Sequence, residues 1–261
     1  MTTWAFFEDF ASVATRWRTW TLMADQDIKL RYKRSLLGPF WISIAMATTV
    51  VTIGFLYAEV LRVPYKEFLI WFGSGLLAWG LISSVMLEGC SIVADNESVL
   101  RSAIMPIPML SARMVYRNVV IFLHNALVIG LLLVLFGTRF SMNTLFVLPG
   151  LALVVLLGVF IGVALGPISA RFRDLAQLIA SIVQVLFFFT PVIWIPAPNM
   201  SRPALIEGNP FFHLVQLIRA PMLGDAPTLL NWQVSCLTLG VAIMLALVSL
   251  IVSRRSIYLW L

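Results

Sequence analysis

A stripe of polar side chains lies within one long apolar stretch of the chain. Gln177, Ser181 and Gln184 are separated by four and then three residues, so on a helix they share one face. The stripe continues into three consecutive aromatic residues, Phe187, Phe188 and Phe189. Amides hydrogen-bond hydroxyl groups and aromatic rings stack on sugar rings, so this face could line a path for a sugar. Such side chains also hold transmembrane helices together, and the spacing leaves both interpretations open.

A short charged segment between two apolar stretches is the second candidate. Asp95 or Asn96 can cap a helix, Glu97 and Arg101 are spaced to form a pair, and prolines at 106 and 108 end the segment. We therefore expect a short helix over residues 96–103. Its predicted functional residues are Asn96, Glu97, Ser98, Val99, Leu100 and Arg101. The segment is either a solvated loop or a docking site for another protein.

Patterns typical of enzymes and metal sites are missing from the sequence. Arg113, Arg117 and His124 share one face of a predicted helix, where Glu88 could pair with either arginine. HExxH, GxSxG and paired carboxylates within the apolar stretches are all absent. None of the three lysines follows a glycine, which excludes a P-loop. We therefore expect no catalytic residue, metal site or cofactor in this chain, and ATP hydrolysis by a separate chain if transport is ATP-driven.

The composition identifies the element that carries these residues. The chain has 261 residues, 61% of them hydrophobic and only 11% charged, whereas soluble domains carry about 25% charged residues. The apolar stretches are continuous rather than alternating, which favours helices over a barrel. The expected fold is therefore an all-α integral membrane protein with six transmembrane helices. The six predicted spans cover about residues 39–58, 68–87, 119–136, 145–170, 175–195 and 232–252. Glycines at 158, 162 and 166 are expected to break the fourth.

The distribution of positive charge predicts the orientation. With six spans, thirteen of the 18 lysines and arginines fall on the side of the N-terminus, so both termini are expected in the cytoplasm. Residues 1–35 lack the apolar core of a signal peptide and have apolar residues at helical steps. We expect an amphipathic helix that lies flat at the cytoplasmic interface, or a soluble helix packed on a partner. Its apolar face is formed by Trp4, Phe7, Ala11, Ala14 and Trp17.

The segment between the last two spans is unusual for a simple loop. Residues 196–230 contain six of the 13 prolines and enclose an apolar run that is too short to cross a membrane. Such a run is typical of a re-entrant helix at the outer side, and the alternative is a surface loop with one amphipathic helix. The predicted outer gate is formed by Phe211, Phe212 and His213.

Four separated strings in the chain also resemble a known family. They are RYKRSLLGPFW (31–41), LRSAIMPIPMLSARMVYRNVVIFLHN (100–125), ARFRDLAQLIASIVQVLFFFTPVIW (170–194) and NPFFHLVQLIR (209–219). In this order they resemble the membrane subunits of type-2 ATP-binding-cassette exporters for polysaccharides, which include O-antigen, capsule and teichoic-acid permeases. The O-antigen type is the most similar.

The resemblance implies a function and partners. It implies a homodimer in the bacterial inner membrane, bound to two cytoplasmic ATPase subunits that hold ATP and Mg²⁺. It also implies export of an undecaprenyl-diphosphate-linked polysaccharide through a channel at the dimer interface. By this resemblance, residues 96–103 match the coupling helix that contacts the ATPase, and residues 1–35 match the interface helix. Residues 36–255 would form the transmembrane domain and 256–261 a cytoplasmic tail.

One further assignment is a hypothesis without a matched motif. Four arginines lie where a lipid diphosphate could be bound, and arginine suits bidentate phosphate contacts. They are Arg31, Arg34, Arg171 and Arg173.

Two other functions remain as alternatives. A type-2 exporter of a small lipophilic compound or drug could use the same aromatic and polar lining. A membrane-embedded lipid-modifying transferase would need clustered carboxylates and histidines, which the sequence does not contain. Nucleic acid is not an expected partner, because no basic run has interleaved aromatic residues and the net charge of +6 suits anionic headgroups.

Overall fold

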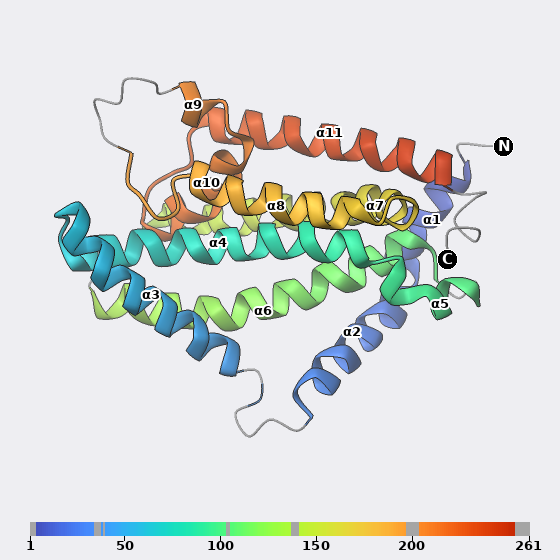
Figure 1. Cartoon of the computed structure of the whole chain (residues 1–261), viewed down its shortest axis with the longest axis horizontal. Helices are drawn as coiled ribbons and strands as arrows, with labels where there is room; N and C mark the ends of the chain where they lie inside the picture. The colour runs from blue at the N-terminus through green and yellow to red at the C-terminus, as the bar shows by residue number, and fades with distance from the viewer. Residues whose placement is uncertain are drawn as a thin grey trace.

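Long helices running side by side make up the computed structural model of the chain (Figure 1). The structure describes residues 4–33, 38, 40–102, 105–136, 141–196 and 204–253, and over these residues it contains helices and no strand. The helices are α1 (Trp4–Thr15), α2 (Trp17–Tyr32), α3 (Phe40–Leu61), α4 (Tyr65–Ser91), η1 (Ala94–Asn96), α5 (Glu97–Arg101), α6 (Ile107–Leu135), η2 (Met142–Phe146), α7 (Val147–Arg171), α8 (Asp174–Phe189), α9 (Ala204–Glu207), α10 (Pro210–Met222) and α11 (Leu229–Ser253). The predicted all-α membrane fold is confirmed at this level.

Five of the described helices are long and apolar enough to cross a membrane. They are α3, α4, α6, α7 with the preceding η2, and α11, which correspond to five of the six predicted spans. The helix that carries the predicted third span, residues 119–136, begins earlier than the span, because α6 already starts at Ile107. Pro108 stands in the first turn, where a missing backbone N–H costs nothing, so the helix can start there.

The predicted fifth span differs from the observed helix. A continuous helix over residues 175–195 was expected, but α8 has only 16 residues and is about 24 Å long, less than the membrane core of about 30 Å. Pro191 accounts for the early end, because the residue before a proline is driven out of the helical region. Thr190 accordingly has an extended backbone with ψ of 134°. In Figure 1, α8 runs beside α4.

Helix α7 lies at the centre of the bundle and contacts α4, α6, α8, α10 and α11. The expected breaks at its glycines are wrong, because the helix is continuous from Val147 to Arg171. These glycines are contact points instead. A Cβ at Gly162 would overlap the hydroxyl of Ser111 on α6, and one at Gly158 would lie 3.0 Å from Val85 on α4. Small residues spaced by four let membrane helices approach closely, which explains the pattern.

The N-terminal segment forms two helices instead of the single amphipathic helix that was expected. The chain turns at Arg16, and both α1 and α2 contact α6. The indole of Trp20 on α2 donates a 2.8 Å hydrogen bond to the carbonyl of Val13 on α1, and its ring packs edge-on against Tyr116 on α6. These contacts favour the turn over a straight helix. Trp17, placed on the predicted apolar face, is 53% exposed.

Candidate functional site

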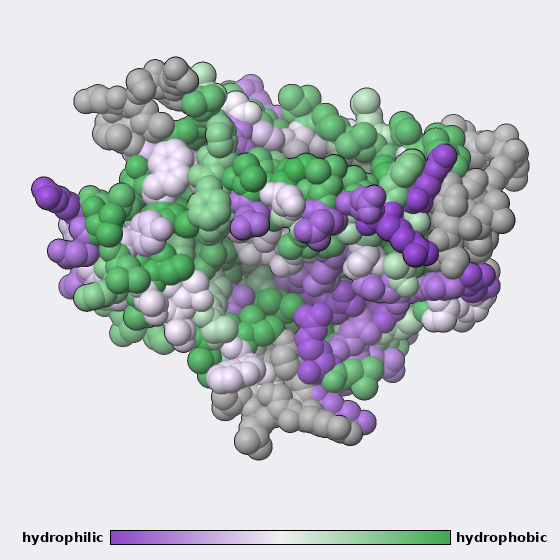
Figure 2. Space-filling model, viewed as in Figure 1, coloured by the Kyte–Doolittle hydropathy of each residue, from purple (hydrophilic) through white to green (hydrophobic). Residues whose placement is uncertain are grey.

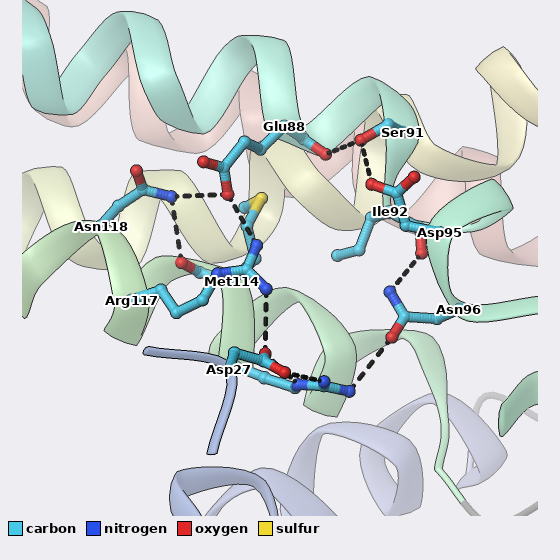
Figure 3. Close-up of polar contacts among 10 residues, drawn as sticks. Asp27, Glu88, Ser91, Ile92, Asp95, Asn96, Met114, Arg117 and Asn118 are labelled. Carbon is cyan, nitrogen blue, oxygen red and sulfur yellow. Dashed lines mark hydrogen bonds and ion pairs between the residues drawn. The ribbon is translucent and has the colours of Figure 1, made fainter. Parts of the chain in front are cut away.

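A polar cleft opens where α2, α4 and α6 meet, beside the short helix α5. It has a volume of about 190 Å³ and is lined by Asp27, Glu88, Ile92, Asp95, Asn96, Leu110, Arg113, Met114 and Arg117. Figure 3 shows most of these side chains pointing toward one another from three helices. In Figure 2 the hydrophilic surface is widest over this part of the molecule. The cleft is therefore the principal polar feature of this end of the bundle.

Asp27 is the centre of the ion pairs in this cleft. Its carboxylate accepts hydrogen bonds from Nε of Arg113 at 2.8 Å and from Nη1 of Arg117 at 3.0 Å. A third bond comes from Nη2 of Arg113 at 2.5 Å. Burial alone would raise the pKa of Asp27, but the hydrogen bonds and charges of Arg113 and Arg117 outweigh it, so its pKa lies below the ordinary value of 3.8. This carboxylate is therefore ionised at neutral pH and fastens α2 to α6.

A second carboxylate ties α6 to α4. Glu88 accepts a 2.7 Å bond from Nη2 of Arg117 and a 3.1 Å bond from Nδ2 of Asn118. The predicted pairing of Glu88 with one of these arginines is thus confirmed, and the partner is Arg117. Because both arginines of the cleft are paired with carboxylates, their charge is largely neutralised. The cleft is therefore poorly suited to bind a phosphate group.

Helix α5 is short, and its two ends are held differently. Arg101 and Glu97 form the predicted pair across one helical turn at 2.7 Å, with both side chains about half exposed. Leu100 is buried, and Val99 packs against the core. Asn96 lies at the N-terminal end but makes no side-chain capping bond, contrary to expectation. Its amide group instead accepts a 3.1 Å bond from Nη1 of Arg113 and donates to the carbonyl of Ile92.

This arrangement links α5 to α2 through one side chain. Arg113 contacts Asn96 with one nitrogen and Asp27 with the other two. A guanidinium can bridge two partners in this way because its donors point in fixed, divergent directions. A displacement of Asn96, at the N-terminal end of α5, would therefore act directly on the ion pair between Arg113 and Asp27 that holds α2.

Helix α8 carries the predicted sugar-binding stripe on an exposed face. Gln177, Ser181 and Gln184 are all exposed, and Phe188 on the same face is 61% exposed. Phe189 is also exposed, whereas Phe187 turns inward and packs against Trp79 of α4 with 5.7 Å between ring centres. Figure 2 shows hydrophilic surface along α8 within a mostly hydrophobic face. The hydroxyl of Ser181 donates a 3.0 Å bond to the carbonyl of Gln177, and the stripe as a whole faces away from the rest of the described chain.

The predicted outer-gate residues lie on α10, which packs between α4, α7 and α11. Phe211 is partly buried and contacts the ring of Trp79 edge-on. His213 is 1% exposed, and its two ring nitrogens are 2.8 Å from Oδ1 of Asn231 and 2.7 Å from the carbonyl oxygen of Glu207. His213 therefore holds α10 against neighbouring elements, while the gate itself remains a prediction.

Three of the four arginines assigned to a lipid diphosphate fall within the described residues. Arg31 is exposed near the end of α2, whereas Arg171 and Arg173 are exposed at the turn between α7 and α8. These two places lie well apart in Figure 1. Arg34 falls outside the described residues. Within one copy of the chain Arg31 therefore lies apart from Arg171 and Arg173, and the diphosphate contact stays a hypothesis.

One residue of the site was missed by the sequence analysis. Asp27 was not predicted to be functional, although it is the main partner of Arg113. The two residues are 86 positions apart along the chain, which hides the pair from local patterns. The available signal was a carboxylate inside the basic segment 16–34. Nothing local to α2 indicates which of the distant arginines it meets.

The long apolar helices are those of a multi-pass membrane protein, with partly buried ion pairs at one end of the bundle. The chain belongs to the ABC-2 type transporter membrane family, whose family model matches residues 18–223. It is therefore a transmembrane permease subunit, and membership implies that it works with an ATP-binding-cassette ATPase.

Named relatives agree with this family. An O-antigen export system permease protein RfbA of Klebsiella pneumoniae is 25% identical over 175 residues, which cover 66% of this chain and 67% of the relative. A protein of the same name from Myxococcus xanthus is 25% identical over 206 residues, which cover 76% and 77% of the two chains. The resemblance stated from the four strings is thus confirmed at the level of the family.

Proposed function

We propose that this chain is the permease subunit of an ATP-driven exporter that moves a lipid-linked polysaccharide of the O-antigen type out across the bacterial inner membrane. The names of the relatives support this cargo. In this proposal two copies of the chain form a homodimer, two ATPase subunits bind below it and the carrier lipid is undecaprenyl diphosphate. Helix α8 and the segment that follows it complete a sixth crossing, and both termini lie in the cytoplasm.

The exposed polar face of α8 is the observation that carries the proposal. The side-chain amides of Gln177 and Gln184 would be costly in contact with lipid, because lipid offers no hydrogen-bond partners, whereas Ser181 already donates to a backbone carbonyl of α8. A second copy that encloses this face around a water-filled path removes the cost. The amides can then bond sugar hydroxyls while Phe188 offers a ring for stacking. Weak repeated contacts of this kind suit a moving polymer.

Helix α5 is proposed as the coupling helix. Its exposed Glu97 and Arg101 would contact the ATPase, while buried Leu100 anchors the helix to the permease. Closure of the ATPase on binding ATP would push α5, and the bridge through Arg113 would pass this movement to α2. This is a rigid-body coupling between two states of the complex.

Two further proposals concern the ends of the path. Arg31 near the end of α2, and Arg171 with Arg173 at the α7–α8 turn, would meet the lipid diphosphate at separate points on the cytoplasmic side. Phe211 and Phe212 would close the path at the outer side as parts of a re-entrant α10.

The test is export of the glycan by the chain reconstituted with its ATPase in inverted vesicles. Gln184→Leu and Phe188→Leu should slow transfer of the lipid-linked polysaccharide into the lumen. Val185→Leu, on an adjacent exposed part of α8, is the matched control and should export normally. Normal export by Gln184→Leu would favour interhelical packing over a sugar path. Transfer of a lipophilic dye without any glycan would replace the cargo with a small compound.

A further inference from the structure

Arg219 on α10 is a fully buried cation without a counter-ion among the described residues. It is 0% exposed, and none of the ion pairs in the described chain includes it. Its Nη1 donates a 2.8 Å bond to the carbonyl oxygen of Pro191, and the guanidinium carbon lies 4.1 Å from the ring centre of Trp71. Nε and Nη2 have no hydrogen-bond partner within the described part of the structure.

The fold makes room for this charge but does not neutralise it. A Cβ at Gly75 of α4 would overlap Nη2 of Arg219, so only glycine leaves space for the guanidinium. The Trp71 ring and the negative end of the α8 dipole, just before Pro191, offset part of the cost of burial. Four of the five N–H groups of the side chain still lack an acceptor in the described structure, and such groups are expensive to bury.

The segment that Arg219 contacts is also held by two neutral donors. Residues 190–194 follow α8 and are irregular, with Thr190 and Val192 fully buried. Nδ2 of Asn209 donates to Oγ1 of Thr190 at 3.0 Å, and Nε1 of Trp71 donates to the carbonyl of Trp194 at 3.3 Å. Two neutral side chains thus already fasten this segment to α4 and to the residue that precedes α10. The charge of Arg219 is not required for the hydrogen bond that it makes, and it needs another explanation.

We propose that Arg219 is a latch for segment 190–194. The position of this segment in the structure, which we call closed, is then only marginally lower in free energy than an open position in which the segment has moved away from Arg219. In the closed state the guanidinium fastens the end of α8 to α10 but stays desolvated and unpaired. When the segment moves away, water hydrates Nε and Nη2 of Arg219, and this hydration offsets the loss of the hydrogen bond to the Pro191 carbonyl. The two positions then differ little in free energy, as a gate that opens in each transport cycle requires. This inference rests on the proposed function, in which α8 lines the path.

The test separates charge from hydrogen bonding. Arg219→Gln keeps a donor for the Pro191 carbonyl but removes the buried charge, so it should stabilise the closed state. In vesicles of phosphatidylethanolamine and phosphatidylglycerol, the purified variant should unfold at a higher temperature than the unchanged chain. With the ATPase present, its export should fall about fivefold, as expected if the ratio of closed to open molecules rises about tenfold from near one. Arg62→Gln, an exposed arginine between α3 and α4, is the control and should change neither value.

A second variant tests the opposite direction. Gly75→Ala should push the guanidinium out of its place and let radiolabelled sucrose leak through the reconstituted chain without ATP. An unchanged or lower unfolding temperature of Arg219→Gln, normal export by that variant, or a sucrose-tight Gly75→Ala would each overturn the latch. If the unchanged complex exports no lipid-linked glycan, the proposed function fails. The unfolding temperature and the sucrose leak still decide the latch in that case, because neither needs the cargo.

Discussion

Removing the charge of Asp27 should release α2 from the bundle. Its carboxylate accepts three bonds from Arg113 and Arg117, and the side chains of the three residues are 14–23% exposed. Breaking a fully buried ion pair costs about 3–5 kcal/mol, and a surface pair contributes about 0–1 kcal/mol. Because this network is mostly buried and asparagine retains one acceptor, we expect Asp27→Asn to cost about 2 kcal/mol.

Hydrogen exchange measures this effect directly. A loss of about 2 kcal/mol corresponds to about a thirtyfold larger open population, so α2 amides should exchange about thirtyfold faster. Amides of α7 should be nearly unaffected, since α7 does not depend on this pair. Asp25→Asn is the matched control on the same helix, because an asparagine there keeps an acceptor for the hydroxyl of Tyr116 and loses no ion pair. Equal exchange of α2 in the two variants would refute the reasoning.

Three other predictions test the charge of Asp27, the ion pair of α5 and the packing of α7 against α10. Asp27 has a lowered pKa in the folded chain, so its contribution to stability is complete above pH 3.8 and is lost as the pH falls through the lower pKa of the folded state. Hydrogen exchange of the α2 amides should become faster in that pH window. The acceleration should be absent in Asp27→Asn. Replacing Glu97 and Arg101 together with alanine should abolish glycan-stimulated ATPase activity and export while the unfolding temperature stays nearly constant, since an exposed pair contributes only about 0.3–0.5 kcal/mol; unchanged export would count against docking at α5. Gly150→Ala should cost about 1–3 kcal/mol, because its methyl group would overlap a backbone carbonyl of α10, whereas Gly240→Ala meets open space; calorimetry that finds equal unfolding temperatures for the two would contradict this packing.

Much of the candidate site could be predicted from local spacing. Glu97 and Arg101 are four residues apart on one short helix, and their pair needs no information from the rest of the chain. The polar face of α8 is likewise a consequence of helical periodicity. The partner of Asn96 could not be predicted in the same way. Its side chain is equally able to cap a helix or to accept from Arg113, and only the packing of α6 against α4 decides between them.

The sequence by itself determined where five of the six predicted spans lie, because the length and composition of an apolar helix act locally. It also placed Pro191 where α8 has to end. Only the tertiary structure decided that the N-terminal segment turns at Arg16 and that Asp27 meets two arginines of α6. It alone also revealed that Arg219 is buried against the ring of Trp71 without a counter-ion among the described residues. Ion pairs and burial depend on which helices meet across long stretches of chain, and the pattern of a single helix does not contain that information.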